Sequence, residues 1–290
     1  ITIHMKKISF FIYKIIKSID LIFVKLLNRS FLLWFADFIN EDQYSSVDIC
    51  EKKTYFFTPN QTIKWRVDTL FTKEPETIEW INSFDKKKKI IFWDIGSNIG
   101  LYSIYAAQTY NDIDIVSFEP STSNLRILSR NISVNNLVEK IKINQLPLGE
   151  KQNTNLIMHE SEFIEGWSMN TFGDPIDHQG KKFKSKQSYS IFGNNINFYI
   201  ENKVLDFPNY IKIDVDGLEH KILKGGDKCL ENEKLESISI ELNENYIEQF
   251  EEVTRIMKEH NFLIKQKKHA KMFDKSELFS NTYNYIFERK

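Results

Sequence analysis

From about residue 89 onward, short apolar runs of strand length alternate with longer segments whose apolar residues recur at helical spacing. This alternation predicts an α/β fold with a mostly parallel sheet, because a helix lies between most pairs of strands. We expect strands near residues 89–94, 113–119, 141–146, 209–214, 236–242, 261–267 and 282–289. We expect helices near residues 99–109, 121–136, 217–224 and 245–259.

Two departures from this alternation carry information. No helix separates the last two expected strands, which should therefore form an antiparallel hairpin at the edge of the sheet. Before the fourth strand, residues 149–208 form a polar insertion rich in Asn, Ser and Gly. Within it we expect residues 155–159 and 188–192 to pair as extra strands, with a loop at 166–173. Long insertions of this kind often frame a substrate site.

The pattern divides the chain into an N-terminal cap, residues 1–85, and a core domain, residues 86–290. The cap should be mostly helical at first. Residues 55–58 and 63–67 are then expected to form a small hairpin around Pro59.

Residues 8–35 are strongly apolar, but lysines and one aspartate interrupt them. No uncharged stretch reaches the roughly twenty residues that a spanning helix needs. The segment should form an amphipathic helix that packs on its own domain or on a second copy of the chain. A membrane-surface helix with basic residues at its rim is the alternative. Residues 1–4 precede Met5, and we expect them to be a vector-derived remnant.

Composition excludes some classes of function. The 290 residues carry a net charge of −1 with a pI near 6.7, so no basic field points to nucleic acid. The two cysteines, Cys50 and Cys229, form no spaced motif, which disfavours a disulfide framework or a zinc site. With no cleavable signal peptide evident, we expect a cytoplasmic protein, with the inner face of the membrane as the alternative location.

Residues 91–100, Ile-Phe-Trp-Asp-Ile-Gly-Ser-Asn-Ile-Gly, join the first core strand to a helix through a glycine turn. Gly96 and Gly100 allow backbone dihedrals and a close ligand approach that other residues resist. The middle glycine of the dinucleotide fingerprint is missing, and Asp94 stands where phosphates would lie. A carboxylate there suits a cationic ligand instead, and S-adenosylmethionine (SAM) has a sulfonium and an ammonium but no phosphate. Glu119 ends the next strand, where a carboxylate can accept both ribose hydroxyls.

Three sequence blocks resemble the FkbM-type family of SAM-dependent methyltransferases. The blocks are FWDIGSNIGLYSIYAA, VSFEPSTSNLRILSRNISVNNL and YIKIDVDGLEHKILKGG, and they occur in the family's order over about residues 88–245. Asp216 is a departure, since the family more often has Glu there. Upstream, Arg66 and the segment at 74–81 resemble the lead-in of members encoded among surface-glycan genes. The resemblance implies a Rossmann-like class I sheet of seven strands.

The resemblance and the residues together give a cofactor site. The residues expected to bind SAM are Glu74, Asp94, Gly96, Asn98, Gly100 and Glu119. Among these, Glu74 is assigned to the amino group by the resemblance alone. Asn98 is a candidate for the SAM carboxylate.

Methyl transfer to a hydroxyl requires in-line positioning and a group that takes the hydroxyl proton. Asp214, at the end of the fourth strand, is our first candidate for this group. His220 is the second, because its ordinary pKa lies near neutral pH. Glu219 and Glu241 are further candidates, although Glu219 can equally be a helix-start residue favoured by the macrodipole.

Acidic residues at neighbouring strand ends also raise the question of a metal. Asp214, Asp216 and Glu241 could hold Mg²⁺ through oxygen ligands. The sequence leaves open whether a metal is present.

The leading hypothesis is an O-methyltransferase that acts on a sugar hydroxyl in a nucleotide sugar or a surface-glycan component. Methylation of a polyketide or lipid hydroxyl, and a SAM-binding interaction module without turnover, are the alternatives. We expect a small-molecule or glycan acceptor and no nucleic acid. The apolar region at 8–35 leaves peripheral membrane contact and self-association as further expectations.

Overall fold

The computed structural model describes residues 2–290, and the chain falls into two compact units, residues 1–44 and 45–290. The hydrophobic pattern places the end of the N-terminal cap near residue 85, whereas the compact division falls at Tyr44. The reason is that the segment after Tyr44 already buries Phe57, Ile63 and Trp80 inside the second unit.

The second unit contains most of the secondary structure. Its elements before the insertion are β1 (Tyr44–Ile49), β2 (Lys52–Phe57), α3 (Gln61–Asp68), α4 (Pro75–Asn82), β3 (Ile90–Ile95), α5 (Leu101–Thr109), β4 (Ile113–Phe118), α6 (Thr122–Val134) and β5 (Ile141–Asn144). Its later elements are β6 (Thr154–Glu160), β7 (Asn170–Phe172), β8 (Gln187–Gly193), α7 (Ile196–Glu201), β9 (Tyr210–Ile213), α8 (Glu219–Lys224), α9 (Asp227–Glu231), β10 (Ser237–Asn243), α10 (Ile247–Glu259), β11 (Phe262–Lys268), η1 (Lys271–Phe273) and β12 (Thr282–Arg289).

The main sheet has seven strands in the order β11-β12-β10-β9-β3-β4-β5. The strands from β10 to β5 are parallel, and β12 runs antiparallel to both β10 and β11. This arrangement confirms the predicted α/β fold, including its C-terminal edge hairpin. Because β9 lies beside β3 and these strands are parallel, the carboxyl ends of β3, β4, β9 and β10 meet at one edge of the sheet.

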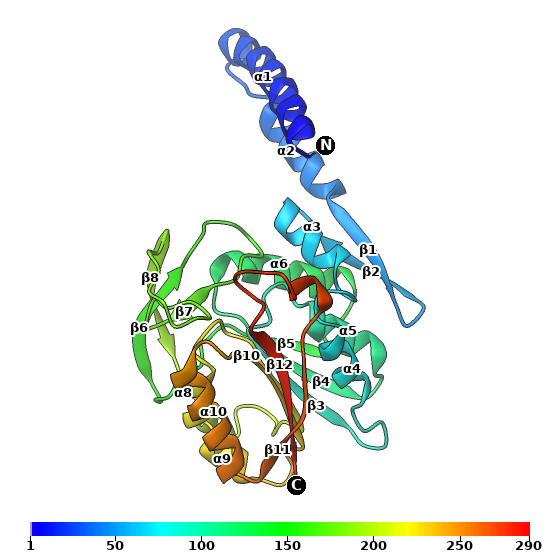
Figure 1. Cartoon of the computed structure of the whole chain (residues 1–290). Coiled ribbons are helices and arrows are strands. Elements are labelled where there is room, and N and C mark those ends of the chain that lie inside the picture. The colour runs from blue at the N-terminus through cyan, green and yellow to red at the C-terminus, as the bar shows by residue number, and fades with distance from the viewer. Residues whose placement is uncertain (1) are drawn as a thin grey trace. The chain divides into compact units, whose positions relative to one another are not determined.

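Helices cover both faces of this sheet (Figure 1). On one face α8 and α10 pack over a core that includes Trp93, Ile213 and Ile240. On the other face α4 and α5 pack together, and α5 contacts β4 and β5. The site described below forms on this second face.

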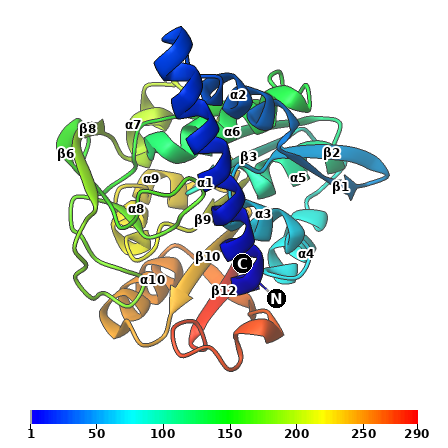
Figure 2. The ribbon, with the colours of Figure 1, turned by 90° about the horizontal axis from the view of Figure 1, so that it is seen from above.

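The polar insertion folds as a separate three-stranded antiparallel sheet in the order β7-β6-β8. Asn155 pairs with Phe192 and His159 with Ser188, so the two extra strands pair with each other at the predicted residues. The expected loop at 166–173 is correct for its first part, but its end forms β7. In Figure 2 the β6 and β8 ribbon lies on the opposite side of the second unit from the β1 and β2 ribbon.

The expected hairpin of residues 55–58 and 63–67 is wrong in its second strand. β2 pairs with β1 through a turn in which Cys50 and Glu51 both have positive φ, the geometry of a tight two-residue hairpin. Residues 63–67 lie instead in α3, which begins because the Asn60 side chain accepts a hydrogen bond from the Ile63 amide at 2.9 Å.

The first unit is a helical hairpin of α1 (Thr2–Leu27) and α2 (Leu32–Asp42). The apolar segment at 8–35 is therefore two helices rather than one. Asp20 of α1 is buried and accepts hydrogen bonds from the Ser30 hydroxyl and from the Phe31 and Leu32 amides at the start of α2. No helix within residues 2–290 has the length and apolar character needed to span a membrane.

Candidate active site

Strand periodicity stacks two rows of side chains on the α4 and α5 face of the sheet. The lower row, aligned across neighbouring strands, is Asp94, Ser117, Lys212 and Ser239. Two residues further along each strand, the upper row is Gly96, Glu119, Asp214 and Glu241. The upper row lines a cavity of about 580 Å³, and the lower row supports it from below.

Asp94 belongs to the supporting row. Its side chain is buried and accepts a 2.6 Å hydrogen bond from Ser103 of α5, which also contacts Ser117. Burial raises the pKa of Asp94, although Lys212 and Ser103 act in the opposite direction. Its Oδ1 atom has no hydrogen-bond partner. Asp94 thus fixes the start of the glycine turn from beneath, and its predicted part in binding SAM, directly or through water, stays a prediction.

The two glycines of the turn are required by the protein itself. Both have φ of +84°. A Cβ on Gly96 would lie 1.9 Å from the Asp214 carbonyl oxygen, and one on Gly100 would lie 2.5 Å from Leu128 Cδ1. Gly96 therefore lets the ends of β3 and β9 approach each other and also lines the cavity. The close backbone contact is made with Asp214.

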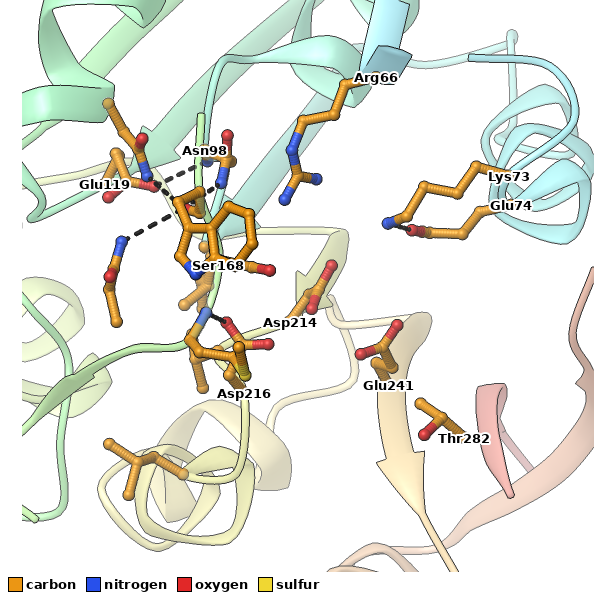
Figure 3. A pocket seen from close by; sticks show the side chains of 18 of the residues that line it. Arg66, Lys73, Glu74, Asn98, Glu119, Ser168, Asp214, Asp216, Glu241 and Thr282 are labelled. Atoms are coloured by element: carbon orange, nitrogen blue, oxygen red, sulfur yellow. Dashed lines mark hydrogen bonds and ion pairs between the residues drawn. The ribbon is translucent and has the colours of Figure 1, made fainter. Parts of the chain in front are cut away.

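Glu119 and Asn98 lie together at one end of the cavity (Figure 3). The Glu119 carboxylate accepts hydrogen bonds from the backbone amides of Asn98 and Ser121, each at 2.8 Å. Burial outweighs these hydrogen bonds and raises the pKa of Glu119 to about 8. Asn98 has a φ of 51°, and its buried Oδ1 atom has no partner. This end of the cavity therefore offers acceptor atoms to a bound ligand.

A loop of the insertion is tied down across this end. The backbone carbonyl of Trp167 accepts hydrogen bonds from the side-chain amides of Asn98, Asn124 and Asn170 at 3.1 to 3.3 Å. The Asn124 Oδ1 atom also accepts from the Gly166 amide at 2.8 Å. We call residues 165–170 the strap. Its contact with Asn98 joins the insertion directly to the glycine turn.

The strap is held at two further points. Arg66 of α3 donates through Nε to the Gly166 carbonyl at 2.6 Å. Asp216 accepts from the Met169 amide at 2.6 Å, which occupies one of its carboxylate oxygens. Figure 3 shows the Arg66 guanidinium pointing into the cavity between the strap and Lys73.

The opposite end of the cavity holds an acidic cluster of Glu74, Asp214 and Glu241, whose oxygens lie within 4.8 Å of one another (Figure 3). Two of the three acids are paired with lysines. Lys73 contacts Glu74 at 2.5 Å, and Lys212, 2% exposed, contacts Asp214 at 2.6 Å. Glu241 is the member of the cluster to which no lysine is bonded.

These pairings separate the protonation behaviour of the acids. Burial disfavours the charge on Glu74, but Lys73 and Lys212 outweigh it and lower the pKa of Glu74 to about 2. Burial, followed by the negative charges of Asp214 and Glu74, raises the pKa of Glu241 well above its usual range. A raised pKa and the lack of a bonded lysine make Glu241 our choice in this cluster for the group that takes a proton.

The cluster differs from the predicted metal set. Glu74 replaces Asp216, which bonds to the strap. The lysines on Glu74 and Asp214 already supply the positive charge that a cation would bring, so these residues fit Mg²⁺ poorly.

Comparison with known proteins decides the family. The family described as "Methyltransferase FkbM domain" matches residues 94–264, which is more than half of the chain. The chain belongs to the FkbM family of methyltransferases. This confirms the resemblance of the three sequence blocks to SAM-dependent enzymes of the FkbM type.

Individual relatives of this FkbM-family chain are distant. It is 25% identical over 158 residues to Methyltransferase sdnD of Sordaria araneosa, which covers 47% of this chain and 60% of the relative. The chain thus spans less than two thirds of the length of the curated relative it matches. Methyltransferase FkbM of Methylobacillus flagellatus KT is 16% identical with a TM-score of 0.45, over 69% of this chain and 43% of that one. TrmK of M. capricolum, solved with S-adenosyl-homocysteine, is 12% identical with a TM-score of 0.41, over 74% and 68%.

Two predicted catalytic residues of the FkbM-family chain lie away from the cavity lining. Glu219 accepts hydrogen bonds from the Val215 and Gly217 amides and from Gln249 of α10, so it closes the turn after β9. His220 is buried and lies edge-on to Tyr246. Neither residue is part of the cavity lining, and their catalytic roles stay predictions.

Sequence reasoning missed one wall of the cavity. The segment between β11 and β12 contributes His269, Phe273, Phe279 and Thr282. This segment carries no sequence motif, so its place in the cavity wall becomes visible only in the folded chain. Across from it, Glu76 of α4 is 1% exposed, and its Oε1 atom accepts from Asn284 at 2.8 Å. The Glu76 Oε2 and Thr282 Oγ1 atoms are buried without partners, so they can bind polar groups of a ligand.

Proposed function

We propose that the protein is a SAM-dependent O-methyltransferase that acts on a sugar hydroxyl in a glycan component. Family membership supports methyl transfer. The single observation that carries the choice of a hydroxyl acceptor is Glu241, the carboxylate of the acidic cluster without a lysine partner. An alcohol is a weak nucleophile at neutral pH, so its methylation needs a base placed beside it.

The cavity fits SAM by the chemistry of its unpartnered atoms. Glu119 ends β4, where a carboxylate can accept hydrogen bonds from ribose hydroxyls. The Asn98 Oδ1 atom, at the same end of the cavity, is buried and has no hydrogen-bond partner. It can accept a hydrogen bond from an ammonium or a hydroxyl group. The many carboxylates of the lining favour a ligand that carries a sulfonium and an ammonium. When bound, SAM supplies an electrophilic methyl group.

In this proposal one end of the cavity binds the cofactor, and the other end binds and deprotonates the acceptor. Glu119, Asn98 and the strap hold the cofactor end. Glu241 would take the proton that the acceptor hydroxyl loses when it accepts the methyl group that SAM would supply. Asp214, held by Lys212, is a positioning acceptor for the same hydroxyl. This assigns the role of base to Glu241, whereas the sequence alone favours Asp214.

The wall from β11 to β12 supports a sugar as the acceptor. Its aromatic side chains, Phe273 and Phe279, line the same cavity as the unpartnered oxygens of Thr282 and of Glu76 on α4. Aromatic rings pack against the apolar faces of sugar rings, and carboxylate and hydroxyl oxygens accept from sugar hydroxyls.

The charge of the lining narrows the class of sugar. The cavity contains six carboxylate residues, Glu74, Glu76, Glu119, Asp214, Asp216 and Glu241, but as cations only Arg66 and Lys73, apart from His269. Carboxyl groups outnumber cations in this lining, and Lys73 is already paired with Glu74, so a diphosphate would find few positively charged partners here. We therefore favour a neutral or amino-bearing sugar over a nucleotide sugar.

An apolar small molecule is the second candidate. Trp65, Phe273, Leu278 and Phe279 give one side of the cavity an apolar surface that would suit a polyketide or lipid hydroxyl. The same base would serve either acceptor.

The test is a methyl-transfer assay with purified protein, radiolabelled SAM and three acceptor pools. The pools are neutral and amino glycosides, nucleotide sugars, and apolar alcohols, with the methylated position assigned by mass spectrometry. We expect transfer to the first pool and little to the second. Transfer to the apolar pool alone would replace the sugar by the second candidate, and absence of SAM binding in calorimetry would reject the whole proposal.

The assay has a matched pair of variants. Glu241→Gln should lower kcat by about 10²- to 10⁴-fold, the range of general-base catalysis, and remove the acidic limb of the pH profile, where the base would become protonated. Glu236→Gln, at the other end of the same strand region and paired with the surface residue Lys88, should leave kcat unchanged. An unchanged pH profile in Glu241→Gln would contradict its role as the base.

A further inference from the structure

The helical hairpin of residues 1–44 exposes more apolar surface than any role in a folded core explains. α2 buries none of its residues, and α1 exposes most of its large apolar side chains, with Phe11 66% and Leu26 75% exposed. Isolated exposed apolar residues are ordinary, but a continuous face of them marks an interaction surface.

This face of α1 is continuous along the helix. At 100° per residue, one stripe carries Ile8, Phe11, Ile12, Ile15, Ile19, Ile22 and Leu26, all exposed. Of the residues that pack toward α2, Asp20 lies away from this stripe and Phe23 lies at its border. Asp20 is bonded to the start of α2, and the ring of Phe23 lies edge-on to Phe31 at 5.4 Å. The stripe is therefore left free by the internal packing of the hairpin.

The charges of α1 identify the partner. The helix contains five lysines, at 6, 7, 14, 17 and 25, and a single acidic residue. That acidic residue, Asp20, is turned inward and consumed by the hydrogen bonds to α2. Lys7, Lys14 and Lys25 share one line along the helix, about a quarter turn from the centre of the apolar stripe. Long lysine side chains at such a rim can keep their charges in the headgroup region while the stripe is buried.

We propose that the hairpin docks the protein on the surface of an anionic lipid bilayer, with the apolar stripe of α1 in the acyl boundary and its lysines among the headgroups. The aromatic residues of α2 agree with this, because exposed Trp34 and Phe38 are one helical turn apart on the same side of that helix. Aromatic rings are favoured at membrane interfaces. An apolar stripe alone would serve a second protein copy equally well, and the row of lysines decides for an anionic surface.

The test uses the full chain and vesicles of defined composition. In co-sedimentation with phosphatidylcholine vesicles containing phosphatidylglycerol, we expect binding that weakens at high salt and is much weaker without the anionic lipid. Each lysine near an anionic surface contributes about a fivefold change in partitioning. The triple variant Lys7→Gln, Lys14→Gln, Lys25→Gln should therefore bind about 100-fold more weakly.

A matched control removes the same charge elsewhere. Lys142, Lys151 and Lys203 are exposed and lie outside the hairpin and the cavity lining, so their triple change to Gln should leave vesicle binding intact. The double variant Phe11→Ser, Ile15→Ser should also abolish binding. The tryptophan emission of the parent chain should shift to the blue when vesicles are added, and this shift should be absent in a Trp34→Phe variant. Equal binding to both lipid mixtures would overturn the proposal. A second result would also overturn it. In that case the parent chain binds no vesicles and forms a dimer without lipid in analytical ultracentrifugation, and Phe11→Ser dissociates this dimer.

Discussion

A single carboxylate, Glu119, makes cofactor binding sensitive to pH. Burial raises its pKa to about 8, so the free protein holds its proton at pH 7. If the ionised form accepts from the ribose hydroxyls of a cationic ligand, binding must release that proton. The affinity for SAM should rise by up to about tenfold per pH unit below pH 8 and level off above it. Calorimetry at pH 7 in buffers of different ionisation enthalpy measures the released proton directly.

Two variants separate Glu119 from its neighbours in this experiment. Glu119→Gln should bind SAM about 10- to 100-fold more weakly and should release no proton, since a charge-assisted hydrogen bond contributes about 1.5–3 kcal/mol. Glu241→Gln should still release the Glu119 proton, although Glu241 also has a raised pKa. Proton uptake on binding, or no pH dependence between 6 and 8, would show that Glu119 stays protonated in the complex.

The two glycines of the turn give a graded pair of stability predictions. Gly96→Ala would place a Cβ 1.9 Å from a backbone oxygen that cannot move away, so we expect a loss of at least about 4 kcal/mol in unfolding free energy. Gly100→Ala would meet only the end of the Leu128 side chain, at 2.5 Å, and should cost about 1–3 kcal/mol, mostly from its positive φ. Urea denaturation measures both. Equal losses would mean that the two backbone conformations, rather than the clashes, set the cost.

At the scale of elements, the core was predictable because its signals are local. The strand at 89–94 agrees with the structure's β3 within one residue, and the helix at 245–259 agrees with α10 within two. In each case the spacing of the apolar residues repeats often enough that one exceptional position does not change the prediction. The number of strands and the class of sheet followed from the resemblance, whereas the order of the strands comes from the structure.

The failures come from interactions that a local pattern does not contain. The segment at 63–67 alternates apolar and polar residues as a strand would, but the Asn60 cap starts a helix there. Lys212 reads as a polar interruption of a strand, and only the fold shows that it sits among Asp94, Glu74 and Asp214. For Glu219 the motif position predicts chemistry, which stays a prediction, and the structure adds three hydrogen bonds that the sequence does not reveal.

Glu219 therefore supports a prediction about the turn between β9 and α8. Glu219→Ala leaves the Val215 and Gly217 amides and Gln249 without their acceptor, and we expect a loss of about 2–4 kcal/mol in unfolding free energy. Burial raises the pKa of Glu219 to about 7, so its contribution is full below pH 4.5 and is lost as the pH rises through 7. The stability difference between the two proteins should accordingly shrink from pH 5 to pH 8 in denaturant titrations.

The catalytic readout distinguishes this role from that of a base. At a temperature where both proteins are folded, Glu219→Ala should keep the pH profile of kcat, and His220→Asn should keep both the profile and the stability of the parent within about 1 kcal/mol. Loss of the acidic limb in either variant would return that residue to the list of bases and weaken the assignment of Glu241.

At the scale of the whole molecule, chemistry and docking reside in different units. Every buried hydrophobic residue from position 4 onward lies between Ile49 and Phe287, and every lining residue of the cavity lies between Gln61 and Asn284. The hairpin of α1 and α2 supplies neither core nor site. Its internal contacts, centred on Asp20, fix only the two helices to each other.

A shortened chain tests this separation. A variant that begins at Gln43 keeps all of β1 and removes no buried hydrophobic residue, so its Tm should stay within about 3 °C of the full chain and its affinity for SAM within twofold. Differential scanning calorimetry and titration calorimetry measure the two quantities, and the same preparation should no longer sediment with anionic vesicles. A Tm drop of about 8 °C or more would mean that residues 1–42 stabilise the second unit, and the exposed stripe of α1 would then need a partner within the protein. Retained SAM binding together with lost vesicle binding would show that the methyltransferase fold works independently of the surface on which the hairpin places it.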